Sequence, residues 1–280
     1  MRKILQSAVL AAAGVFVAGA QAGPFILAGT DADDHGSASG GANLLGWLFM
    51  QRALENLAAG VTNGNKTIYT LGSSLGDALN AANSAFSLST TLNVSGGWNI
   101  VNVDGAADIT AFFGAGGASS SAGIIMLDSG SEVSGGLTPL ELTALTNSAG
   151  AINTFVGGGG GLFSQSNGYG WLSALLPSLT VDNSGGTGLA LTAAGSAAFP
   201  GLTNADLSSG PYHSNFLNVG SIPVLATGIG SLSSYNVIIG ASGGSITNPV
   251  PAIPEPSTYA LMLAGLGMIG FLARRRKAAA

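Results

Sequence analysis

The sequence of 280 residues contains no cysteine and few charged residues. Without cysteine the chain can form no disulfide, and it offers neither a thiolate metal ligand nor a thiol nucleophile. Charged residues make up 8% of the chain, whereas an average globular domain has about 25%. Hydrophobic residues make up 46%, which argues against intrinsic disorder, since disorder requires low hydrophobicity and high net charge.

Basic residues are scarce between the two ends of the chain. Six of the eight lysines and arginines lie at the ends: Arg2, Lys3, Arg274, Arg275, Arg276 and Lys277. Between Gly23 and Ile253, two basic residues stand against twelve acidic ones, a net charge of −10. Because proteins bind nucleic acids through basic patches, we expect no nucleic-acid partner.

Residues 1–22 have the three parts of a secretory signal peptide. A positive start is followed by an apolar stretch at 4–18, and Ala20-Gln21-Ala22 has the A-x-A form of a cleavage site. We therefore expect cleavage after Ala22 and a mature chain that begins at Gly23. A buried N-terminal helix is the alternative interpretation.

Residues 257–280 form a second short hydrophobic segment with a basic end. The apolar stretch 259–273 is followed directly by Arg274, Arg275, Arg276 and Lys277. A helix of that length spans about 22 Å, less than the ~30 Å hydrocarbon core of a membrane. We expect a marginal transmembrane helix, with both basic ends of the chain in the cytoplasm and the body outside it.

The residues before this helix carry a recognisable signal. Pro254, Glu255, Pro256 and Ser257, followed by the apolar helix and the basic cluster, resemble the PEP-CTERM sorting signal. The resemblance implies recognition by a membrane-embedded exosortase, cleavage near Pro-Glu-Pro, and delivery to the cell surface or the extracellular matrix. The family occurs in bacteria that make exopolysaccharide, so the expected partners are exosortase, the membrane and exopolysaccharide. Residues 249–256 would be a Pro-rich linker that ends in the motif.

Residues 23–248 would be the exported domain, in which strand-like and helix-like stretches alternate. Strands are expected at 25–28, 66–72, 98–104, 122–128, 189–192, 222–226 and 235–239, and helices at 42–60, 75–86 and 138–156. The last helix should begin with Thr138 as N-cap, Pro139 in the first position and Glu141 in the third. The alternation predicts an α/β domain with a mostly parallel sheet and helices on both faces.

Several stretches of the body resemble a glutamine amidotransferase-like, flavodoxin-like domain of bacterial surface proteins. They are FILAGTDADDH, IIMLDSG followed by GGLTPLELTAL, INTFVGGGGGLF and GLTNADLSSGPYHSNF. Catalytic members of that superfamily have a cysteine nucleophile on a strand-to-helix turn. Because the chain has no cysteine, the resemblance implies a binding module or an enzyme with different chemistry.

One loop gathers most of the candidate site residues. Asp31, Asp33, Asp34 and His35 follow the first strand, and His213 is the other histidine of the chain. A loop after a parallel strand lies at the carboxyl edge of the sheet, where open α/β folds bind ligands. The carboxylates suit Ca²⁺, and with His35 a transition metal, so a divalent metal is one interpretation and no other cofactor is expected. An acidic turn that caps the next helix is the alternative.

Other candidate residues have structural alternatives. His213 could act as a base for Ser164 or Ser166 in GLFSQSN, although this is not a G-x-S-x-G motif and a structural histidine is the alternative. The Gly157–Gly161 run lacks the lysine of a phosphate loop, so we interpret it as a tight turn. Trp47, Trp98 and Trp171 could stack on sugars or pack in the core.

Two functions are compatible with these patterns. The first is a non-enzymatic surface or matrix protein whose body binds a ligand or matrix component. The second is a secreted hydrolase or metal-dependent enzyme that uses the Asp31–His35 loop and His213.

Overall fold

The computed structural model describes residues 23–74, 76–129, 135–165 and 169–241. All of them belong to a compact unit that spans residues 1–246. The expected signal peptide, linker, sorting motif and C-terminal helix lie outside the described residues. Within the described residues, no helix combines the length and apolar character that crossing a membrane requires.

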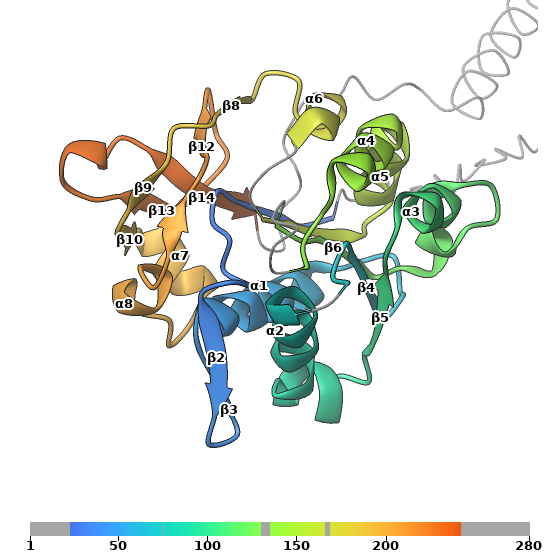
Figure 1. The fold of residues 1–280 in the computed structure, drawn as a ribbon, viewed down its shortest axis with the longest axis horizontal. Helices are drawn as coiled ribbons and strands as arrows, with labels where there is room; N and C mark the ends of the chain where they lie inside the picture. The colour runs from blue at the N-terminus through green and yellow to red at the C-terminus, as the bar shows by residue number, and fades with distance from the viewer. Residues whose placement is uncertain (1–22, 75, 130–134, 166–168, 242–280) are drawn as a thin grey trace, which may run out of the picture. The chain divides into compact units, whose positions relative to one another are not determined.

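A sheet of ten strands runs through this unit (Figure 1). Its main path is β10-β13-β14-β1-β7-β6-β4-β5, and β12 and β8 are attached through β14. The strands are β1 (Phe25–Ala28), β4 (Thr67–Leu71), β5 (Asn99–Val103), β6 (Ile124–Leu127), β7 (Gly161–Ser164), β8 (Thr180–Asp182), β10 (Leu189–Leu191), β12 (Asn215–Leu217), β13 (Val224–Gly228) and β14 (Asn236–Ala241). Two small antiparallel pairs are separate from it, β2 (Gly36–Ser39) with β3 (Ala42–Leu45), and β9 (Gly186–Thr187) with β11 (Pro211–Tyr212).

The sheet is mixed, so the prediction of a mostly parallel sheet was wrong. Strands β1, β7, β6, β4 and β5 are parallel to one another. Strand β14 pairs antiparallel with β1, and β13, β10, β12 and β8 also pair antiparallel. The cause lies in the connections. Parallel neighbours need a crossover of a dozen or more residues, but only residues 229–235 lie between β13 and β14. A connection this short places β14 antiparallel beside β13.

Helices cover both faces of the parallel half, as the sequence predicted. Figure 1 shows α1 and α2 on one side of β4 and β6, and α3, α4 and α5 on the other. In β1, alternate residues enter different cores: Ile26 packs with α1 and α2, and Leu27 packs with the other helices. The helices are α1 (Gly46–Gly60), α2 (Gly76–Ser87), α3 (Ala106–Phe113), α4 (Pro139–Asn147), α5 (Ala149–Gly157), α6 (Leu172–Leu175), α7 (Ala193–Ala198) and α8 (Asn204–Leu207).

Two helix predictions need correction, one at its start and one in its middle. The helix expected at 42–60 begins at Gly46, because Ala42–Leu45 is strand β3 of a hairpin with β2. Gly40 and Gly41, with φ of 60° and 81°, make the two-residue turn of that hairpin, a backbone that favours glycine. The helix expected at 138–156 is divided at Ser148, which ends α4 and precedes α5.

The expected start of α4 is confirmed. Thr138 accepts a hydrogen bond from the backbone of Glu141, Pro139 occupies the first turn, and the Glu141 side chain accepts from the Thr138 backbone. This reciprocal capping satisfies two backbone N–H groups that a helix start would otherwise leave free.

Candidate functional site

The candidate loop lies at the carboxyl edge of the parallel strands. Residues 29–35 follow β1, Asp128 follows β6 and Gln165 follows β7, and these three strands are parallel neighbours in the order β1-β7-β6. Because parallel strands end at the same edge, side chains from three separate segments are brought together there. The edge contains two centres.

At the first centre, Asp31 contacts both histidines of the chain. Asp31 Oδ2 lies 2.9 Å from His213 Nε2 and 3.5 Å from His35 Nε2. The Asp31 side chain is 12% exposed, against 35% for His35 and 41% for His213. The other oxygen, Asp31 Oδ1, is buried without a hydrogen-bond partner among the described residues. A buried carboxylate therefore has two imidazoles between it and solvent.

The backbone holds His213 at this position. The His213 N–H donates to the Gly29 carbonyl at 2.7 Å, and Thr30 forms an isolated antiparallel bridge with Tyr212. The approach is close, since a Cβ on Gly29 would lie 1.8 Å from the Ser214 carbonyl oxygen. Glycine at position 29 therefore lets the 212–214 segment pack against the end of β1.

The space beneath this centre is small. A cavity of about 10 Å³ is lined by Thr30, Asp31, His35, Phe49 and Ser209 among other residues. A volume of that size holds roughly one water molecule. A larger ligand would have to reach Asp31 and the imidazoles from the solvent side.

At the second centre, Asp33 points into the protein, away from the two histidines. Its Oδ2 accepts a hydrogen bond from Ser129 Oγ at 2.8 Å, and Asp33 is fully buried. Asp128 is also fully buried; its Oδ2 accepts from Ser73 Oγ at 2.5 Å and its Oδ1 from the Ser129 N–H at 2.9 Å. Gln165 connects this centre to the first loop, because its Oε1 accepts from the Ala32 N–H at 3.1 Å and its Nε2 lies 3.4 Å from Asp128 Oδ1.

The pKa values of both buried carboxyl groups are raised. Burial raises the pKa of Asp33 well above its ordinary value, and repulsion from Asp128 and Asp34 adds to this effect. Burial raises the pKa of Asp128 to about 6, against the hydrogen bonds from Ser73 and Ser129, which lower it. The two groups therefore form a buried carboxyl pair in which both pKa values are raised, so that ionisation of the pair is opposed.

The structure thus separates the predicted site residues. It brings Asp31, His35 and His213 together, places Asp33 with Asp128, and leaves Asp34 in the turn, where its N–H donates to the Asp31 carbonyl. In the described ranges, no group of three histidine, aspartate or glutamate side chains is placed to hold a metal ion. The divalent metal stays a prediction from the residue types alone.

Of the two serines that the serine hydrolase interpretation considers, Ser164 lies in the described part of the chain. Ser164 is buried, and its hydroxyl donates to the backbone carbonyl of Gln165 at 3.3 Å, whereas the bond of the His213 ring goes to Asp31. Ser166 lies outside the described residues. Ser164 is therefore not placed as a nucleophile beside His213.

The tryptophans have structural positions. Trp98 and Trp171 are 8% and 1% exposed and pack in the two cores, while Trp47 is half-buried and its Nε1 donates to the Asp33 carbonyl at 2.7 Å. The Gly157–Gly161 run leads directly into β7, and a Cβ on Gly160 would lie 2.2 Å from the Phe155 ring. These observations favour core packing and a tight turn.

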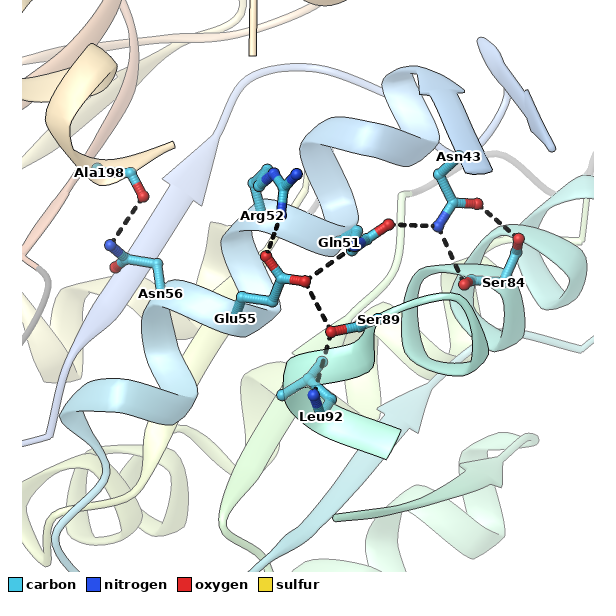
Figure 2. A network of polar contacts seen from close by, with 9 residues as sticks. All are labelled: Asn43, Gln51, Arg52, Glu55, Asn56, Ser84, Ser89, Leu92 and Ala198. Atoms are coloured by element: carbon cyan, nitrogen blue, oxygen red, sulfur yellow. Dashed lines mark hydrogen bonds and ion pairs between the residues drawn. The ribbon is translucent and has the colours of Figure 1, made fainter. Parts of the chain in front are cut away.

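A second polar network lies between α1, α2 and the β2–β3 hairpin (Figure 2). Glu55 accepts hydrogen bonds from Gln51, Ser89 and Arg52, and Gln51 in turn accepts from Asn43. Burial alone would raise the pKa of Glu55, but these hydrogen bonds hold it below its ordinary value. The network joins α1 to the hairpin and to α2 around a half-buried carboxylate.

Sequence reasoning missed the Asp33–Asp128 pair as a unit. The available signal was Asp128-Ser129 at the end of a fully apolar strand, since a carboxylate there reaches the same edge as the Asp31–His35 loop. Ser73 and Gln165 carried no comparable signal, because polar residues after strands are common in turns.

Comparison with known proteins identifies one feature of the chain. Residues 252–277 match the PEP-CTERM protein-sorting motif. No curated protein and no solved structure matches the chain, and the amidotransferase-like resemblance of the body is not confirmed. The motif implies an exported protein that is processed at the membrane. The chain therefore carries a PEP-CTERM sorting motif in residues 252–277, and this motif implies sorting by exosortase.

Proposed function

We propose that this chain is an exported surface or matrix protein whose α/β body binds a ligand without catalysing a reaction. In this proposal a C-terminal helix anchors the precursor in the inner membrane, exosortase cuts near Pro254-Glu255-Pro256, and the body reaches the cell surface or the matrix. The sorting motif at 252–277 supports this route. The lack of cysteine supports a non-catalytic body, because the chemistry of the amidotransferase-like resemblance needs a thiol.

The observation that carries the binding role is the contact of Asp31 with two partly exposed imidazoles. A carboxylate accepts hydrogen bonds, and an imidazole donates from one ring nitrogen and accepts at the other. A polar ligand with hydroxyl groups can therefore exchange hydrogen bonds with His35 and His213 from solvent. The exopolysaccharide of the producing cell is the proposed ligand at this edge.

Sorting is tested by following the two ends of the protein in its native host. Fractionation and terminal mass mapping should find the mature wild-type chain outside the inner membrane, beginning at Gly23 and ending near Pro256. Glu255→Ala should stay in the membrane fraction with Lys277 retained, while the control Asn248→Ala, outside the motif, should behave as wild type. Retention of Lys277 in the exported wild-type protein would contradict processing at the motif.

Binding is tested with the mature protein purified from exporting cells and the isolated exopolysaccharide of the same host. Cosedimentation should be reduced in Asp31→Asn and in His213→Ala, because each loses the contact that joins them. Asp77→Asn, which removes an exposed carboxylate on α2, is the matched control. Equal cosedimentation of all four proteins would show that this edge does not bind the polysaccharide.

A secreted hydrolase or metal-dependent enzyme is the second candidate, favoured by the 2.9 Å contact of His213 with Asp31. In a nucleophilic site, a histidine and a carboxylate in contact serve as the base and its orienting acid. Esterase and glycosidase assays on the mature protein, with His213→Ala as comparison, test for a hydrolase. Thermal unfolding with Ca²⁺, Mn²⁺ or Zn²⁺, compared between wild type and Asp31→Asn, tests for a metal-dependent enzyme. Hydrolysis that His213→Ala abolishes, or a metal-dependent shift that Asp31→Asn abolishes, would replace the non-catalytic proposal.

A further inference from the structure

A cleft of about 540 Å³ opens at the amino edge of the parallel strands, opposite to the edge that carries Asp31. Its walls come from the loop before β4, from the short helical turn η2 (Ala118–Ser121) before β6, and from α5 and the turn before β7. The polar and aromatic side chains that line it include those of Asn63, Asn65, Phe113, Ser120, Thr154 and Phe155. Sites for small ligands have volumes of about 300–1,000 Å³, so this cleft has the capacity of a binding site.

Polar groups on three of these walls are held in fixed positions. Asn63 Nδ2 donates to the Ala122 carbonyl at 2.8 Å, and Asn65 Nδ2 donates to the Ser120 carbonyl at 3.1 Å. The hydroxyls of Ser120 and Thr154 donate to the backbone carbonyls of Gly117 and Gly150, at 3.0 and 2.9 Å. A hydroxyl that donates one bond still has lone pairs that accept, so these exposed oxygens offer acceptors to a ligand.

Two aromatic rings add apolar surface to the same cleft. Phe113 and Phe155 are each half-buried. Phe113 packs edge-on against Phe112 with ring centroids 4.9 Å apart, and the Phe155 ring lies so close to Gly160 that a Cβ there would be 2.2 Å away. Because their neighbours fix both rings, little side-chain entropy is lost when a ligand packs on them.

We propose that this cleft binds a neutral carbohydrate. A sugar ring has an apolar face that packs on aromatic rings and hydroxyl groups that donate to amide and hydroxyl oxygens. None of the lining residues is charged, so the cleft offers no partner for the charge of an ionic ligand, whose desolvation would be uncompensated. The site is separate from the Asp31 edge and adds a second ligand contact to the proposed surface or matrix protein.

The test uses isothermal titration of the mature protein, purified from exporting cells, with gluco-, manno- and galacto-hexasaccharides. A hexamer of galacturonate is the charged comparison. Thr154→Trp places an indole in the cleft. Thr143→Trp on α4 is the matched control, because Thr143 is also exposed and its hydroxyl also donates to the carbonyl four residues earlier. Circular dichroism establishes that both variants fold.

We expect at least one neutral hexasaccharide to bind wild type and Thr143→Trp equally, and to bind Thr154→Trp at least about tenfold more weakly. Asp31→Asn should leave this binding unchanged. The inference is overturned if no neutral hexasaccharide binds, if the galacturonate hexamer binds as well, or if Thr154→Trp binds like wild type. If Asp31→Asn alone abolishes binding, the sugar belongs to the opposite edge, and the proposed function survives while the cleft assignment fails.

Discussion

Replacing Asp33 by asparagine should stabilise the folded protein at neutral and alkaline pH. Asp33 and Asp128 are both fully buried, and their hydrogen bonds come from hydroxyls, an amide and a backbone N–H rather than from cations. Burial and mutual repulsion therefore make ionisation of the pair unfavourable. Asparagine has the same shape as aspartate and can still accept from Ser129, but it carries no charge at any pH.

The size and sign of the effect follow from the raised pKa values. A carboxyl group whose pKa is raised in the folded state stabilises that state below its ordinary pKa, and the contribution is lost as the pH rises through the raised value. For Asp128, the difference between 3.8 and about 6 corresponds to about 3 kcal/mol. The pKa of Asp33 is also raised, so the loss continues toward higher pH.

The opposite trend operates at low pH. Hydrogen bonds hold the pKa of Glu55 below its ordinary value despite burial, so the stability that Glu55 contributes is lost as the pH falls through that lowered value. The two trends together place the maximum of stability at mildly acidic pH.

The assay is urea unfolding of the mature protein at a series of pH values. Between about pH 4 and about pH 7, wild type should lose free energy of unfolding on the order of 3 kcal/mol, and Asp33→Asn should lose less. Asp77→Asn, at an exposed position, should follow the wild-type curve within about 1 kcal/mol. A wild-type stability that rises over this range, or an Asp33→Asn curve parallel to wild type, would refute the reasoning.

Other substitutions test separate parts of the structure. Glu55→Gln should cost about 1–3 kcal/mol in urea unfolding, because it weakens charge-assisted hydrogen bonds in the network of Figure 2. Thr138→Ala should cost about 1 kcal/mol in thermal unfolding, because it removes the α4 cap. Gly29→Ala should lower the unfolding temperature and move the His213 imidazole signals in NMR spectra, because its Cβ would clash with the Ser214 carbonyl; unchanged spectra would contradict the close approach.

The parallel half of the sheet could be predicted from the sequence because its signals are local. Strands such as β6 are continuous apolar runs buried on both faces, and the helices between them show apolar spacing and, in α4, a complete cap. The antiparallel half has strands of three to six residues separated by turns. Their pairing depends on contacts between distant segments, such as Leu27 with Ile239, and no local pattern encodes such partners.

The candidate site shows the same division. Residue types identified the Asp31–His35 loop, and the topology placed it at the carboxyl edge, but the direction of each side chain depended on packing. Asp31 and Asp33 are two residues apart and lie in one loop, yet Asp31 contacts His213, 182 positions away, and Asp33 contacts Ser129, 96 positions away. A five-residue cluster of acidic groups is therefore two centres with different environments.

The residue after β7 shows how the carboxyl edge of the sheet is held together. Gln165 is 1% exposed, and its amide joins the Ala32 N–H to the Asp128 carboxyl. It holds together the loops after β1, β7 and β6. Among the described residues, this edge presents the imidazoles of His35 and His213 to solvent, and they can contact a large ligand at the surface without enclosing it. Surface contact of this kind is what the proposed role of an exported binding protein requires.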